Sequence, residues 1–142
     1  MASNPLIGTW RLLSWENRDA DGHISYPLGK DAVGYIMYNP DGYMSVAIMR
    51  PERVKFAAED LLSGSIEEKA YAAGTYVSYC GRYELHGEKV VHHVHLSLFP
   101  NWVGVDQERI VEVRGNRMTL SSTRPILLGG VQRTAHLIWE RV

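Results

Sequence analysis

The chain of 142 residues has little of several features that would assign it to other classes of protein. Its one cysteine, Cys80, excludes an intramolecular disulfide framework and any zinc site made of several cysteines. Charge of one sign is not in excess, because 15 Lys and Arg residues oppose 16 Asp and Glu residues, so we expect no nucleic-acid partner. No apolar run is long enough to span a bilayer, and the first residues lack a signal-peptide pattern. We therefore expect no membrane partner, a cytoplasmic location and a single domain, residues 1–142.

Turn signals recur along the chain about every 8–12 residues, between short runs rich in β-branched and aromatic residues. This spacing is typical of an antiparallel sandwich or barrel. The strongly apolar last run, 135–139, favours closure into a barrel over an open sheet edge. The expected strands, about nine in number, cover residues 9–17, 23–26, 33–38, 43–49, 76–85, 90–98, 107–113, 118–122 and 134–140.

A short helical insertion interrupts the strand pattern. Residues 57–62 resemble a helical turn, and a helix begins at Ser65, whose hydroxyl forms a capping-box pattern with Glu68. That helix is expected to end near Gly74 and either to lie across one barrel mouth as a lid or to plug an end. Residues 99–104, which contain a proline, are expected to form a loop that carries the candidate wall residue Trp102.

Alternation along the strands predicts which side chains point inward, because successive residues of a strand face opposite sides. In the hairpin around residues 39–42 we place Tyr35 and Met37 inside with Met44, since this is the more apolar face. The Tyr38 side chain then falls on the other face. The residues predicted to share the inner face of this hairpin are Tyr35, Met37, Met44, Val46 and Ile48.

The hairpin around residues 86–89 is expected to pair Leu85 with Val90. On the seventh expected strand Arg109 is the inward charge, because it alternates with Glu108. The inner face of the hairpin then holds Val77, Tyr79, Gly81, Tyr83, His92, Val94, Leu96 and Leu98, and the opposite face, with His93 and His95, is solvated. The provisional lining of the interior is Trp10, Tyr35, Met37, Met44, Tyr79, Tyr83, His92, Arg109, Leu137 and Trp139.

The aromatic composition is unusual, because eight tyrosines and four tryptophans accompany only two phenylalanines, and there are six histidines. Hydroxyl and N–H tips need hydrogen-bond partners when they are buried. Two explanations remain open. The rings can lie half-buried on sheet surfaces, or they can surround a cavity that is apolar in body and polar at chosen points.

Motifs of several enzyme classes and cofactor sites are missing: the chain has no Gly-x-Ser-x-Gly elbow, no phosphate-binding glycine loop and no His-Glu-x-x-His helix. His93 and His95 lie two apart on one strand face, but no third ligand at a fixed spacing completes a metal set. We therefore expect no metal and no cofactor.

The chain resembles the small bacterial and fungal lipocalin-like domain family, whose members are calycin-type barrels. The resemblance rests on a co-linear set of stretches: Gly8-Thr9-Trp10-Arg11-Leu12, residues 34–38, 41–45 and 81–84, His92-His93-Val94, and residues 97–102. It implies an all-β, antiparallel up-and-down barrel with an interior site for a small, largely apolar molecule. It implies no particular reaction, because a fold does not fix a function.

Three functions remain as hypotheses. The first is binding of a small hydrophobic or amphipathic molecule, with His92 and Arg109 as polar contacts, tyrosine hydroxyls as donors, and Trp10 and Trp102 among the walls. The second is a cofactor-free isomerase or cyclase with His92 as acid and base. The third is a structural or interaction module whose barrel is filled by its own side chains. A homodimer is compatible with each of them.

Overall fold

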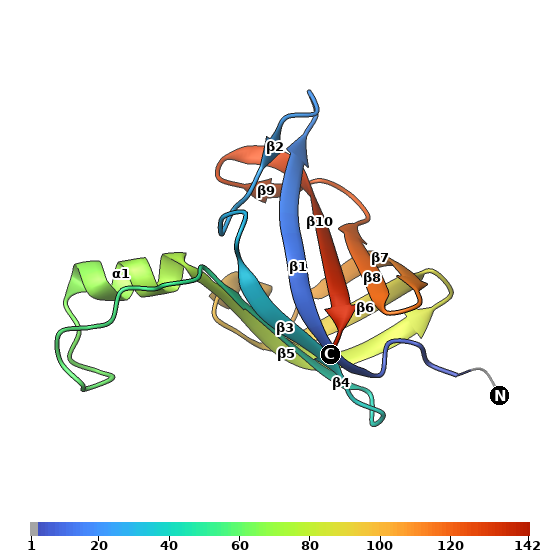
Figure 1. Ribbon diagram of the computed structural model, residues 1–142, viewed down its shortest axis with the longest axis horizontal. Coiled ribbons are helices and arrows are strands. Elements are labelled where there is room, and N and C mark those ends of the chain that lie inside the picture. The colour runs from blue at the N-terminus through green and yellow to red at the C-terminus, as the bar shows by residue number, and fades with distance from the viewer. Residues whose placement is uncertain (1–2) are drawn as a thin grey trace.

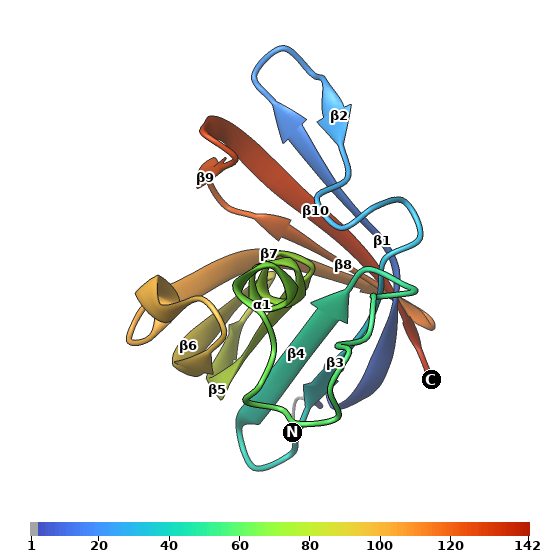
Figure 2. The ribbon, with the colours of Figure 1, turned by 90° about the vertical axis from the view of Figure 1, so that its left-hand side faces the viewer.

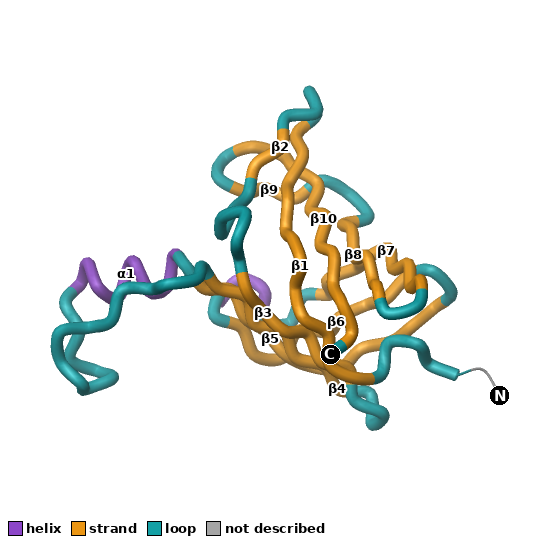
Figure 3. Tube along the Cα trace, in the orientation of Figure 1, coloured by secondary structure: helices purple, strands orange, loops and turns teal. Residues whose placement is uncertain are grey.

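The computed structural model describes residues 3–142 and is built mainly of antiparallel strands (Figure 1, Figure 3). Residues 1–2 of the expected domain lie outside the described part. The elements in chain order are β1 (Gly8–Asp19), β2 (Ile24–Ser25), β3 (Val33–Tyr38), β4 (Tyr43–Met49), α1 (Ile66–Gly74), β5 (Tyr76–His86), β6 (Lys89–Ser97), a 3₁₀ turn (Pro100–Trp102), β7 (Asp106–Arg114), β8 (Arg117–Ser122), β9 (Ile126–Leu128) and β10 (Val131–Arg141). No helix among the described residues is long and apolar enough to cross a membrane.

The sheet closes into a barrel because β1 pairs with β3 on one side and with β10 on the other. Pairing of β1 with β10 runs from Trp10 opposite Arg141 to Asp19 opposite Arg133. The ring therefore contains β1, β3, β4, β5, β6, β7, β8 and β10, while β2 and β9 add short pairings to β1 and β10 at one rim. This confirms the predicted closed antiparallel barrel with a helical insertion.

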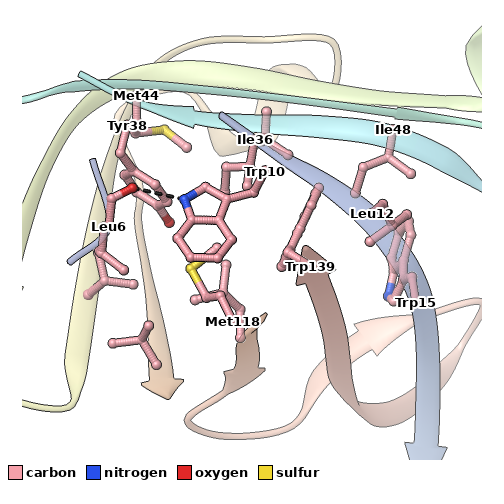
Figure 4. Close-up of a cluster of buried hydrophobic side chains, with 14 of the residues drawn as sticks. Leu6, Trp10, Leu12, Trp15, Ile36, Tyr38, Met44, Ile48, Met118 and Trp139 are labelled. Carbon is pink, nitrogen blue, oxygen red and sulfur yellow. Dashed lines mark hydrogen bonds between the residues drawn. The ribbon is translucent and has the colours of Figure 1, made fainter. Parts of the chain in front are cut away.

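One end of the barrel is plugged. Leu6 precedes β1 and is fully buried, and the Trp10 indole N–H donates to its carbonyl oxygen at 2.9 Å (Figure 4). The Arg141 guanidinium lies 4.1 Å from the centre of the Trp10 ring on the outside of this plug. The start of β5, the loop after β6 and strand β9 surround the opposite end, which is open to a cavity.

The helical insertion projects away from the barrel as an arm (Figure 1, Figure 2). Helix α1 begins at the predicted capping box of Ser65 and Glu68, but none of its residues is buried. Ile66 on the helix and Leu61 before it are 85% and 86% exposed. Neither expected position of the helix, as a lid across the mouth or as a plug of one end, is therefore correct. The helical turn expected at residues 57–62 is also wrong, because Asp60 caps local turns there.

The predicted inward faces of Tyr35 and Met37 are wrong, because the β3–β4 hairpin is shifted by one residue. Tyr38 pairs with Met44, and Gly42 in the turn has φ +90°. The Asn39 N–H donates to the Tyr43 carbonyl oxygen at 2.8 Å, so the hairpin loop holds the three residues 40–42 and not the expected four, and a shift of one residue exchanges the two faces of a strand. Tyr35 and Met37 are consequently 49% and 43% exposed, whereas Tyr38 is buried.

The β5–β6 hairpin begins as predicted, with Leu85 opposite Val90, and then changes register at a bulge. Gly81 pairs with Val94, but Cys80 pairs with Leu96, so His95 is the extra residue. Leu96 and Leu98, which alternation places inside, are therefore exposed. The predicted inward residues of β6 that precede the bulge, His92 and Val94, are buried as expected.

Gly81 is required for this bulge. A Cβ built on Gly81 meets the carbonyl oxygen of His93 at 1.8 Å, so Gly81→Ala forces the two backbones apart. We expect the variant to lose about 1–3 kcal/mol of unfolding free energy in urea titrations. Gly74→Ala is the control, because no neighbouring atom lies within 4 Å of its Cβ and alanine suits a helix. Equal stability of the two variants would contradict the bulge as described.

Candidate functional site: a polar-tipped chamber below the barrel mouth

A cavity of about 600 Å³ opens at the unplugged end of the barrel. Its walls come from the end of α1, the start of β5, the loop after β6 and the β9 segment. The lining residues are mostly apolar: Ala73, Gly74, Tyr76, Val77, Ser78, Leu98, Phe99, Pro100, Trp102, Gln107, Ile126, Leu127, Leu128 and Gly129. This volume is in the range of small-molecule sites.

A smaller chamber of about 60 Å³ lies deeper in the barrel. It shares Val77, Trp102, Ile126 and Leu128 with the mouth, so the two spaces adjoin. The Trp102 ring packs edge-on against both Tyr79 and Phe99, which places it at the junction. The chamber is lined by Trp15, Ile36, Val46, Ile48, Val77, Tyr79, His92, Trp102, Arg109, Leu120, Ile126, Leu128, Ala135, Leu137 and Trp139.

A buried histidine joins two tyrosines beside the chamber. The His92 Nε2 atom lies 2.7 Å from the Tyr38 hydroxyl, and its Nδ1 atom lies 2.7 Å from the Tyr79 hydroxyl. Strands β3, β5 and β6 contribute these groups, and all three side chains are buried. Both ring nitrogens of His92 are thus engaged by protein groups.

Burial keeps this network uncharged. It lowers the pKa of His92 from 6.5 to about 3, and the positive charge of Arg109 acts in the same direction. Burial also raises the pKa of the Tyr38 and Tyr79 hydroxyls. A neutral imidazole with both nitrogens occupied is poorly suited to exchange protons with a bound molecule, so the geometry does not favour His92 as acid and base.

Arg109 reaches the interior from β7, as alternation predicts. Its Nη1 atom donates to the Glu108 carbonyl oxygen at 2.8 Å, and its Nη2 atom donates to Gln107 Oε1 at 3.1 Å. The guanidinium is half-buried and lines the chamber. It supplies the only formal charge among the residues that line the chamber in the described part of the chain.

The predicted site residues therefore fall into three groups. Tyr79, His92, Arg109 and Trp102 meet at the chamber, together with Leu137 and Trp139 from the predicted lining. Three further candidates, Trp10, Met44 and Tyr83, are buried as expected but do not line it. The last two candidates, Tyr35 and Met37, lie on the outer surface.

Tyr83 illustrates the second group. Its hydroxyl donates to the Asn39 carbonyl oxygen at 2.8 Å and accepts from the Asn4 amide at 3.0 Å. Both partners belong to the plugged end, so the hydroxyl fastens a turn and the N-terminal segment to the barrel.

Several site residues were missed by alternation. Tyr38 was assigned to the outer face because of the hairpin shift. Trp15 and the β9 residues Ile126 and Leu128 join the site only through closure of the barrel. The apolar character of the 126–128 run is the one local signal that could have indicated them.

The remaining histidines form no metal set with one another. His93 lies on the outer surface between Glu84, 2.8 Å from its Nε2 atom, and Asp106, 2.7 Å from its Nδ1 atom. Ligand atoms of Asp19, Asp21 and His23 do gather within 4.8 Å at the β1–β2 turn. There the Asp19 carboxylate accepts backbone N–H groups, which explains the cluster as a turn cap.

The histidines give the stability a defined pH dependence. The pKa of His92 is lowered, so its contribution is present above pH 6.5 and lost as pH falls toward about 3. The carboxylates of Glu84 and Asp106 raise the pKa of His93, so its contribution is present below pH 6.5 and lost as pH rises through the raised value. Denaturant titrations across pH measure both.

His92→Gln is expected to cost about 1–3 kcal/mol at pH 7, because it breaks the buried network, and to flatten the loss of stability between pH 6.5 and 4. His93→Gln is the control, which should keep that acid loss and remove the loss on the alkaline side. If His92→Gln lost as much stability between pH 6.5 and 4 as the wild type does, the neutral, buried state of His92 would be disproved.

The sequence matches the family model described as "Lipocalin-like domain" over residues 7–142. It is 34% identical over 107 residues to the "4'-hydroxy-3'-methoxypropiophenone carrier protein ppsC" of Aspergillus oryzae, covering 70% of this chain and 96% of that protein. A solved, uncharacterized protein from Bacteroides eggerthii has a TM-score of 0.48 at 14% identity, covering 96% of this chain and 99% of that one. For a variant of the fluorescent protein UnaG the TM-score is 0.41 at 17% identity, with 96% and 95% covered. The family match over nearly the whole chain shows that this protein belongs to the lipocalin-like domain family.

Proposed function

We propose that this protein is a non-covalent carrier that binds a small hydrophobic or amphipathic molecule through the open end of its barrel. The observation that carries the proposal is the apolar mouth of about 600 Å³, which continues into a chamber with a few polar groups. Such a combination of an apolar wall and a few fixed polar groups is typical of small-molecule sites.

The interior also supports binding over a purely structural role. Side chains fill the plugged end, where Trp10, Tyr38 and Met118 are fully buried (Figure 4). At the other end, the apolar side chains of Leu98, Phe99 and Leu127 remain exposed around the mouth. A bound apolar molecule would remove these side chains from water, which is favourable.

The fungal relative supports the same class of function, since its name describes a carrier of an aromatic ketone. We infer a molecule of similar size and character for this protein. A His92-dependent isomerase or cyclase has less support, because neighbouring hydroxyls occupy both ring nitrogens.

Binding of 4'-hydroxy-3'-methoxypropiophenone tests the proposal, with affinity measured by calorimetry. Trp102→Ala should weaken binding about 10-fold or more, because the ring lies at the junction of mouth and chamber and its buried surface is lost. Met37→Ala is the matched control, since Met37 lies on the outer surface and its loss should leave the affinity within about twofold. Equal affinities of wild type and Trp102→Ala would refute this location of the site.

A further inference from the structure

We propose that the deep chamber holds an uncharged carbonyl oxygen of the carried molecule, which accepts hydrogen bonds from the Trp139 indole N–H and the Tyr79 hydroxyl. The molecule then enters with its carbonyl end first and leaves its ring in the mouth. This inference rests on the proposed carrier function and adds the chemical group that the site recognises.

The Trp139 indole is the first indication. It is fully buried and lines the chamber, and its Nε1–H has no acceptor among residues 3–142. The other deeply buried indoles are satisfied: Trp10 donates to the Leu6 carbonyl oxygen and Trp15 to Asn17 Oδ1. Buried donors are nearly always paired, so an unpaired one beside a cavity indicates a place for an acceptor.

The protons of the tyrosine–histidine network give the second indication. Tyr38, neutral His92 and Tyr79 carry three polar protons in total, one each, and the two hydrogen bonds between them use two. Neither hydroxyl has another partner in the described part of the chain. One tyrosine O–H is therefore free to donate.

The tautomer of His92 decides which hydroxyl this is. When His92 carries its proton on Nδ1, the ring donates to the Tyr79 oxygen and accepts from Tyr38, which leaves the Tyr79 proton free. Tyr79 lines the chamber and Tyr38 does not. An acceptor bound in the chamber thus selects the Nδ1–H tautomer.

The composition of the chamber explains why the group is an uncharged acceptor. Its lining contains no Asp or Glu, so a donor on the ligand would find no carboxylate there. The terminal nitrogens of Arg109, its one charged residue, already donate to Glu108 and Gln107. The two free donors at Trp139 and Tyr79 are uncharged, so they suit a carbonyl oxygen, which loses far less hydration free energy on entering the chamber than a carboxylate does.

The size of the chamber sets the orientation. About 60 Å³ accommodates the end of a small molecule, while the adjoining 600 Å³ accommodates a ring beside Trp102 and Phe99. The ligand class is therefore an aromatic ketone or aldehyde with a short substituent on its carbonyl group.

The experiment compares propiophenone with propylbenzene, which has the same skeleton without the carbonyl oxygen. Calorimetric titration of wild type and Trp139→Phe with both probes gives four affinities. We expect Trp139→Phe to weaken propiophenone binding by about 3- to 10-fold, the factor of one neutral hydrogen bond, and to leave propylbenzene within about twofold.

Trp15→Phe is the matched control, because Trp15 lines the same chamber and its N–H is already bonded to Asn17. It should affect the two probes equally. If Trp139→Phe also changes both probes equally, or changes neither, the inference is wrong while the carrier function stands. If the wild type binds neither probe nor 4'-hydroxy-3'-methoxypropiophenone, the carrier function fails as well.

A measurement on the wild type covers the case in which Trp139→Phe does not fold. In spectra of ¹⁵N-labelled protein, the Trp139 indole proton should shift downfield with propiophenone and not with propylbenzene, as a new hydrogen bond requires. The His92 ring nitrogens should shift toward the Nδ1–H tautomer in the same titration. An indole resonance that responds alike to the two probes overturns the proposal.

Discussion

Pairing of the first long strand with the last is the constraint on which the rest of the structure depends. It turns a sheet into a barrel and thereby creates an interior. Residues from both ends of the chain, such as Trp15 and Trp139, then line the same chamber. The pairing also removes the two long sheet edges that would otherwise be open to association with other chains.

The interior of the barrel contains polar side chains in addition to the apolar ones that form its core. His92 lies between two tyrosine hydroxyls, and Arg109 lies beside Gln107 on the same strand, β7. Each of these groups is buried or half-buried and has a hydrogen-bond partner, which offsets the free-energy cost of removing it from water. The Trp139 N–H differs from them, because it has no partner in the described part of the chain.

Features that depend on residues close together in the sequence could be predicted from it. The capping box at Ser65 and the pairing of Leu85 with Val90 are both present. The errors come from one-residue shifts of strand register. The Gly42 loop is compatible with two hairpin lengths, and the bulge at Gly81 depends on how closely the His93 backbone approaches, which no local pattern records. The predicted inward orientation therefore holds for Tyr79, His92 and Arg109 and fails for the β3 residues and for Leu96 and Leu98 beyond the bulge.

The plug formed by Leu6 and Trp10 closes one end of the barrel, and the mouth lies at the opposite end. A molecule inside cannot pass through to the other side, so it must leave by the path through which it entered. A second molecule cannot displace it from behind. Under the proposed carrier function, loading and release are successive events at the unplugged end, and the residence time depends on the mouth residues that also line the chamber, Trp102 among them.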